Sequence, residues 1–388
     1  MHQSLRHEHD MGTITGRLRD VAAAAVDVVA PSTAIDHAAG TMTLTEPIFT
    51  EDGAYTEVPI EFTRTALRQQ ADRFDIPLKY VDFLAAHQPG LLITNLNERS
   101  RATNKPTLYR MLRQDPGDGG SVCKVRATLS NGYQAIDNLD VLTAAVRGAA
   151  RANIDIGGCH VEGDWTDDRF RLCIAIPQIA VAAPELLGDY RSPWSDTGYM
   201  PPGLVGDHQV GDVIWAGLEI SNSETGGGAA SVAPRAFILR CRNGMVRKAD
   251  MIRSVHLGGR LDEGLVVWSQ DTKRKSLELV ESRMADAVNQ FCSEDYLRGL
   301  ITEMGKAKGV EVANVTKAME VAQVKLGFTD EEVDAALNCF VKSGDVSVFG
   351  LGQSFTAAAQ TVSDGDRQTE IEQSFWDVIA RPHEFAGT

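Results

Sequence analysis

The apolar and polar positions in the central part of the chain predict a strand, a helix and two further strands, in that order. Residues 122–129 form a run typical of a strand, and Ser-Asn-Gly at 130–132 favours a turn after it. Apolar residues then recur at steps of three and four over 138–151, which is the period of one helical face. Residues 154–161 and 169–176 follow as an antiparallel pair, because apolar and polar side chains alternate in the second of them.

The patterns on either side of this part predict mixed elements before it and mainly helices at the end of the chain. The expected strands lie at 91–95, 214–220, 236–241 and 251–257. The expected helices lie at 63–74, 80–87, 277–291, 311–326, 330–343 and 367–380. Pro89-Gly90 is expected to separate the second of these helices from the strand at 91–95.

Together these elements predict an α+β fold, with a small antiparallel or mixed sheet, packed helices and an α-helical C-terminal region. The length of 388 residues is enough for two or three domains. We expect an N-terminal α+β region at 1–115, an α+β core at 116–260 and a helical region at 261–388. Residues 177–211 are long for a connection, so we expect a functional loop or a lid there.

Composition is typical of a globular protein. Hydrophobic residues make up 43% of the chain and charged residues 23%, which excludes a wholly disordered chain. No segment has the length and apolarity of a membrane helix, and the first residues lack the pattern of a signal peptide. We therefore expect a cytoplasmic protein with no membrane association. The six cysteines are widely spaced, which favours buried thiols over metal ligands.

Positive charge is concentrated in two short segments of an acidic chain. The formal net charge is −15, yet residues 99–126 carry seven Lys or Arg against two Asp, and residues 235–260 carry seven against one. An acidic protein with this distribution can present a cationic groove to a phosphate backbone. Alternatively, the two segments are solvated charged surfaces, which is the commoner role of charge runs.

Nine residues in or near these segments form the candidate nucleic-acid site. If 236–241 is a strand, Arg240 and Arg242 share one of its faces, because side chains alternate along a strand. Tyr133 is a candidate for stacking on bases. Residues 221–228 end in three glycines, and this loop either cradles a phosphate or forms a flexible hairpin tip. The expected phosphate contacts are Arg110, Arg113, Lys124, Arg126, Arg240, Arg242, Arg247 and Lys248.

The sequence contains no recognisable motif for enzymatic chemistry. It has no P-loop, no dinucleotide fingerprint and no G-x-S-x-G element. Glu219, Glu224, Asp137 and Asp140 are the carboxylates that a metal-dependent nuclease could use, but no metal-binding signature joins them. Asp137 is more simply a helix cap. We therefore predict no catalytic residues, no metal site and no cofactor.

Several short segments resemble a known family. Leu-Ser-Asn-Gly-Tyr at 129–133, Ile-Asp-Asn at 136–138, Asn-Ser-Glu-Thr-Gly at 222–226 and Leu-Arg-Cys-Arg-Asn-Gly-Met at 239–245 are similar to the phage/plasmid-like family called domain of unknown function nine-three-two. Residues 349–359 resemble the C-terminal segment of that family, although Gln353-Ser354-Phe355 departs from its pattern. The resemblance spans roughly residues 90–360. It implies a protein carried by phages or plasmids that acts in the cytoplasm of the bacterial host, with no established catalytic residues.

A more distant similarity is to the phage single-strand annealing recombinases, whose cores combine a small antiparallel sheet, a helix and a basic groove. This similarity implies a homo-oligomeric protein that binds and anneals single-stranded DNA during recombination, without bond chemistry. The alternative is a phage structural or host-interaction protein with no nucleic-acid role, whose basic segments pair with its own acidic residues. A metal-dependent nucleic-acid enzyme is the third function considered.

Overall fold

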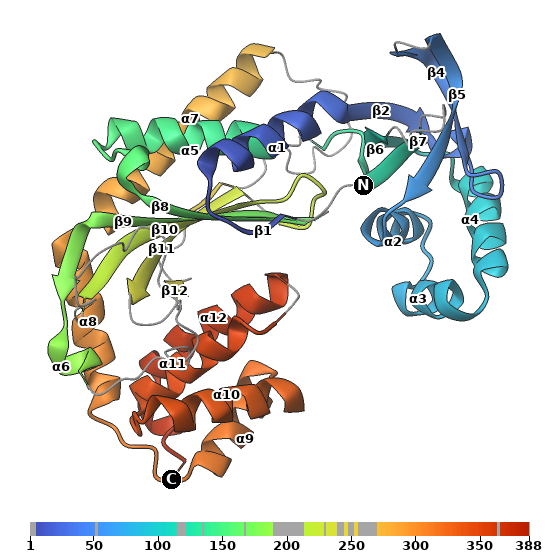
Figure 1. Ribbon diagram of the computed structural model, residues 1–388. Helices are drawn as coiled ribbons and strands as arrows, with labels where there is room; N and C mark the ends of the chain where they lie inside the picture. The colour runs from blue at the N-terminus through green and yellow to red at the C-terminus, as the bar shows by residue number, and fades with distance from the viewer. Residues whose placement is uncertain are drawn as a thin grey trace.

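Two β-sheets with packed helices form the protein, and helices dominate its C-terminal region, which confirms the predicted α+β class (Figure 1). In the computed structural model, a seven-stranded sheet lies in the middle. A six-stranded sheet lies beyond one end of it, and most of the C-terminal helices lie below it in Figure 1. The structure describes residues 5–50, 53–114, 122–133, 136–166, 168–188, 213–228, 230–238, 244–246, 252–254, 270–362 and 365–387.

The six-stranded sheet belongs to the N-terminal part of the chain and is mixed. Its strands, in spatial order, are β2 (Ala25–Pro31), β6 (Pro106–Gln114), β7 (Val122–Ser130), β5 (Gly53–Phe62), β4 (Thr41–Thr50) and β3 (Ile35–Asp36). Strands β5 and β7 run parallel, and the other neighbours run antiparallel. One face packs against α2 (Arg64–Arg73), beside which lie α3 (Leu78–His87) and α4 (Pro89–Thr103).

The seven-stranded sheet is antiparallel. It contains β1 (Leu5–Glu8), β8 (His160–Trp165), β9 (Phe170–Ala182), β10 (Val213–Asn222), β11 (Ala230–Ile238) and β12 (Gly244–Val246) in that order, and β13 (Ile252–Ser254) also pairs with β11. A core of side chains from β9 and β10 packs against α1 (Met11–Ala24), α5 (Asn138–Arg151) and α7 (Gln270–Phe291). These three helices lie together above the sheet in Figure 1.

The C-terminal helices form a second core with the far ends of the same strands. They are α8 (Glu294–Lys308), α9 (Val315–Leu326), α10 (Asp330–Ser343), α11 (Val348–Ala359) and α12 (Gly365–Ala380), and the short α6 (Pro184–Leu187) joins them. The strands contribute Val181, Ile214, Ala216, Ala236 and Ile238 to this core. Within the described residues, no helix is long and apolar enough to cross a membrane.

The structure confirms several predicted elements and corrects two. The strand predicted at 154–161 overlaps β8 only at its last two residues, because residues 156–158 form a short 3-10 helix. Residues 91–95, predicted as a strand, lie inside helix α4. Helix α3 ends at His87, before Pro89, as predicted. Pro89 then begins a new helix, because proline suits the first helical turn, where its missing N–H is not needed. Leu92, Leu96 and Ser100 then recur every four residues on the buried face. Most of the predicted connection 177–211 lies outside the described residues, apart from the end of β9 and α6.

The expected boundaries do not separate independent sheets. The boundary at residue 115 falls between β6 and β7, which are antiparallel neighbours in one sheet. Strand β1, near the N-terminus, pairs with β8 of the other sheet. The boundary at residue 260 lies outside the described residues. The N-terminal and central parts of the chain are therefore interwoven.

Helices α5 and α7 approach closely at Gly148, which generates a first prediction. A Cβ at this position would lie 2.6 Å from the Met284 Cβ and 2.8 Å from the Glu281 carbonyl oxygen. We expect Gly148→Ala to lower the free energy of unfolding by about 1 to 3 kcal/mol, because the helices must move apart. Gly16 of α1 is the matched control, since nothing lies within 4 Å of its would-be Cβ. There, alanine is expected to stabilise the helix by about 0.5 to 1 kcal/mol in urea unfolding. Equal effects of the two substitutions would contradict this packing.

Candidate functional site

The centre of the candidate site is the carboxylate of Glu224, in the loop between β10 and β11. The residue is only 5% exposed. One carboxylate oxygen accepts a hydrogen bond at 2.6 Å from Nη1 of Arg126, a residue of β7 that is 1% exposed. The other oxygen accepts the backbone N–H of Asn138 at 2.7 Å. That N–H belongs to the first turn of α5, where a negative charge is favoured by the helix dipole.

Arg110 of β6 lies beside this carboxylate and is also buried. Its Nη1 donates to the Glu224 backbone carbonyl at 3.1 Å, and its Nη2 donates to Asp137 at 2.6 Å. Its Nε lies 3.1 Å from both carboxylate oxygens of Asp27 on β2. Burial alone would lower the pKa of Arg110, but Asp27 and Asp137 outweigh it and raise that pKa above its usual value. This guanidinium is therefore held charged inside the protein.

Hydrogen bonds to two other segments and one close backbone approach hold the loop in place. The side-chain amide of Asn222 donates at 2.8 Å both to the Ile136 carbonyl and to the Asn138 side chain. Gln69 of α2 donates to the Thr225 carbonyl at 2.7 Å. Gly226 has a φ of +84°, and a Cβ there would lie 2.9 Å from Leu129. We call this set of contacts around residues 222–226 the Glu224 junction.

The Glu224 junction joins three of the five segments that carry the family resemblance. Residues 129–133 and 136–138 are distant in sequence from 222–226 but contact them here. Strand β7 belongs to the six-stranded sheet and β10 to the seven-stranded one, so the junction also connects the two sheets. Its polar side chains thus have a structural role in holding two parts of the fold together.

A second group of buried charges lies between the seven-stranded sheet and α12. Arg235 of β11 donates to Glu219 at 2.7 Å and to Glu372 of α12 at 3.0 Å. Arg171 of β9 donates to Asp164 at 2.8 Å and to Glu372 at 3.2 Å. Two guanidiniums thus face three carboxylates, and we call this group the α12 charge cluster.

A buried thiol lies within the α12 charge cluster. Arg235 Nη1 is 2.9 Å from the Cys173 sulfur. Burial raises the pKa of the Cys173 thiol, an effect that the two neighbouring arginines only partly oppose. The thiol is therefore a neutral member of the cluster at neutral pH.

The structure places part of the predicted nucleic-acid site inside the protein. Arg110 and Arg126 were expected to contact phosphates, but both are buried and bonded to carboxylates of their own chain. Tyr133 is half-buried with its ring against Gly226, and burial raises its pKa to about 12. Part of this ring is therefore covered by the loop of its own chain.

The other predicted residues divide into two groups. Arg113 is exposed and Lys124 is half-buried, on the neighbouring strands β6 and β7. These two remain accessible to a ligand. The others, Arg240, Arg242, Arg247 and Lys248, lie outside the described residues.

The carboxylates that were considered for a metal-dependent nuclease are not brought to one place. Glu224 belongs to the junction, Glu219 to the α12 charge cluster, and each is paired with arginine. Asp137 precedes α5 as predicted, but its side chain pairs with Arg110 instead of capping the helix. Asp140 is exposed on α5. Among the described residues, no three His, Cys, Asp or Glu side chains lie together as a metal site would need.

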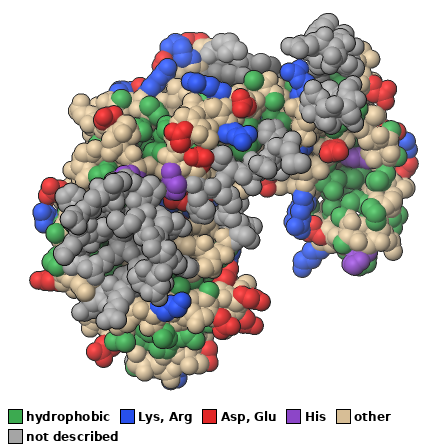
Figure 2. Space-filling model, viewed as in Figure 1, with side chains coloured by type: hydrophobic (Ala, Val, Ile, Leu, Met, Phe, Trp, Pro, Cys, Tyr) green, Lys and Arg blue, Asp and Glu red, His purple; other side chains and the backbone are tan. Residues whose placement is uncertain are grey.

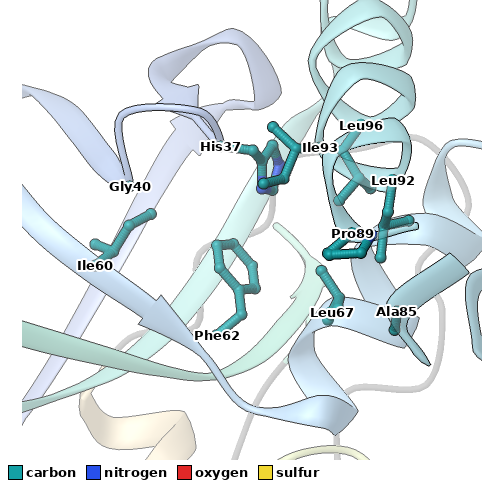
Figure 3. A pocket seen from close by; sticks show the side chains of 10 residues that line it. All are labelled: His37, Gly40, Ile60, Phe62, Leu67, Ala85, Pro89, Leu92, Ile93 and Leu96. Atoms are coloured by element: carbon teal, nitrogen blue, oxygen red, sulfur yellow. The ribbon is translucent and has the colours of Figure 1, made fainter. Parts of the chain in front are cut away.

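Sequence reasoning missed the apolar pocket of the N-terminal part, which is shown in Figure 3. It has a volume of about 300 Å³ and lies between β5 and the helices α2, α3 and α4. Its walls include Phe62 of β5, Leu67 of α2 and Ile93 of α4. His37, in the turn after β3, supplies a polar side chain to an otherwise apolar wall. No local sequence pattern could predict this pocket, because its residues come from five separate segments.

The comparisons with known proteins add no relative. No protein-family model, no curated protein and no solved structure matches this chain.

The Glu224 junction generates a second prediction. We expect Glu224→Gln to lower the free energy of unfolding by about 3 kcal/mol, because it leaves the buried Arg126 without a compensating charge. Glu57→Gln is the matched control, since Glu57 is exposed on β5 and should change stability by less than about 0.5 kcal/mol. Urea unfolding of both variants measures the difference. If Glu224→Gln costs no more than the control, the junction does not hold the fold.

Proposed function

We propose that this chain is a non-enzymatic interaction protein of the phage structural or host-interaction class. The observation that carries the proposal is the burial of Arg110, Arg126 and Arg235 in ion pairs with carboxylates of the same chain. The family resemblance supports a phage or plasmid origin and action in the cytoplasm of the bacterial host, as part of the same proposal.

The ion pairs oppose phosphate binding on energetic grounds. To reach a DNA backbone, Arg126 would have to leave Glu224, and an unpaired buried carboxylate is strongly unfavourable. The same holds for Arg235, which is bonded to Glu219 and Glu372. On the face seen in Figure 2, cationic and anionic side chains are interspersed. Such a surface favours neither a polyanion nor a polycation.

The exposed apolar side chains favour a protein partner. Phe83 of α3 is 52% exposed, and Tyr80 and Leu91 on α3 and α4 are each 42% exposed. In the C-terminal helices, Val324 and Val341 are still more exposed. Exposed apolar groups that gather on one part of a surface are typical of interaction sites. A second copy of this chain is one such partner, in line with the homo-oligomer that we expect.

A second candidate function is the binding and annealing of single-stranded DNA. It is favoured by the exposure of Arg113 on β6. Lys124 of β7 pairs with Leu112, whereas Arg113 pairs with Cys123, so the two cations lie on opposite faces of the sheet. In this function Arg113 or Lys124 would act together with the basic residues of segment 240–248, and the buried arginines would only support the fold. A metal-dependent nucleic-acid enzyme remains the third candidate.

The third prediction separates the first two functions. We expect the purified, folded protein to show no tight binding to fluorescent single-stranded DNA between about 50 and 200 mM salt, and none to duplex DNA. Tight binding that weakens steeply with salt would contradict the interaction proposal and favour the second candidate.

Charge-reversal variants then locate any binding that is found. Under the second candidate, Arg113→Glu/Lys124→Glu and Arg240→Glu/Arg242→Glu each reduce affinity with the fold intact. Arg17→Glu/Arg19→Glu on α1 is the matched control, because it reverses two exposed arginines outside the predicted site. Strand cleavage that stops when a chelator removes divalent metal would identify the enzyme instead.

A further inference from the structure

Helix α3 carries aromatic side chains on its exposed surface. Tyr80, Phe83 and His87 follow one another at steps of three and four residues, so they lie on one side of the helix. Tyr80 is 42% exposed and Phe83 is 52% exposed, and the ring centroids of Phe83 and His87 are 4.8 Å apart. Leu91, near the start of α4, is also exposed. We call these four residues the α3 face.

A second exposed apolar surface lies on α10. Leu337 and Val341 are 37% and 71% exposed, and their spacing of four residues places them on one side of the helix. Val346, just beyond the end of α10, is 59% exposed. We call these three residues the α10 face. Burial of both faces against another protein surface would remove apolar area from water.

The surface that carries the α3 face is positively charged. From the start of α2 to the end of α4, six Lys or Arg stand against four Asp or Glu. Lys79 is exposed and lies four residues before Phe83, on the same side of α3. Asp82, the only acidic residue of α3, is already paired with Arg64 and Arg68 of α2. The charge beside the aromatic side chains is therefore that of Lys79.

The surface that carries the α10 face has the opposite charge. From the start of α9 to the end of α10, three Lys stand against five Asp or Glu. Asp334 is exposed and lies three residues before Leu337, and Glu331 is exposed one turn earlier. Two copies of the chain that joined equal faces would bring like charges together. An α3 face that packs on an α10 face instead pairs opposite charges and covers apolar groups on both sides.

The two faces lie in different parts of the molecule, with α3 beside the six-stranded sheet and α10 among the C-terminal helices (Figure 1). We propose that the α3 face of one copy of this chain packs against the α10 face of a second copy. Because the two faces differ, such a contact leaves one face of each copy open, and further copies extend the assembly until it closes. The inference rests on the proposed interaction function and identifies both the partner and the surfaces that it uses.

The experiment measures the molar mass of the full chain by sedimentation equilibrium over a range of concentrations. We expect assemblies larger than a monomer. Phe83→Glu and Val341→Lys each give one face the charge of the face that it meets, and each is expected to weaken association about tenfold or more. Leu279→Glu on α7 is the matched control, because Leu279 is 41% exposed but lies outside both faces, and it should leave the mass unchanged. Circular dichroism checks the fold, and Tyr80→Glu or Leu337→Lys replaces a variant that does not fold.

Mixing the two variants tests whether the faces bind each other. The Phe83→Glu chain keeps its α10 face, and the Val341→Lys chain keeps its α3 face. An equimolar mixture is therefore expected to form a dimer with one copy of each, at concentrations where each variant alone is monomeric. A mixture that stays monomeric would overturn the inference. So would an unaltered chain that is monomeric up to about 100 µM, or association that neither substitution weakens.

These outcomes are separate from the DNA titration. A chain that neither self-associates nor binds single-stranded DNA loses this interface but keeps its proposed interaction function, with a different protein as its partner. A chain that binds DNA tightly loses the proposed function, whatever its molar mass.

Discussion

The burial of the Glu224 carboxylate is the constraint on which the arrangement of the two sheets depends. An ionised carboxylate can leave water only if charged or hydrogen-bonding partners replace it. Here the partners are Arg126 of the six-stranded sheet and the first N–H group of α5, while Glu224 itself follows a strand of the other sheet. Because each partner comes from a different part of the chain, the carboxylate can be satisfied only when all three parts are in place. The loop at 222–226 therefore acts as a specific connection between the sheets.

The burial of Glu224 also changes how the clustered basic residues in the sequence are interpreted. In sequence, the basic segments suggest a cationic groove in an acidic chain of net charge −15. In the fold, Arg110 and Arg126 complete the Glu224 junction, and Arg171 and Arg235 complete the α12 charge cluster. Arginine suits both places, because its planar guanidinium can serve several carboxylates at once and keeps its charge when buried. The features of the N-terminal part that a ligand or partner can reach are instead the apolar pocket and the exposed apolar side chains of α3 and α4.

The local pattern of the sequence predicts much of the fold but little of the site. Strand β7 and helices α5 and α10 match their predicted ranges closely, because each carries a strong two-residue or 3.6-residue period. The prediction of a strand at 91–95 is wrong because a short apolar run fits a strand and a buried helical face equally well. The contacts of the site could not be predicted from the sequence, for a different reason. The partners of Arg126 and Arg110 lie 98 and 83 residues away in the chain, and no local pattern shows which carboxylate an arginine will meet.

The most direct test of the account is a double-mutant cycle on Arg126 and Glu224, measured as free energies of unfolding in urea. The single variants Arg126→Met and Glu224→Gln each leave one buried charge without its partner, whereas the double variant removes both charges. The account predicts a coupling energy of about 2 kcal/mol or more, with the double variant more stable than the sum of the two single losses implies. Additive losses, within about 0.5 kcal/mol, would contradict the claim that this ion pair holds the two sheets together.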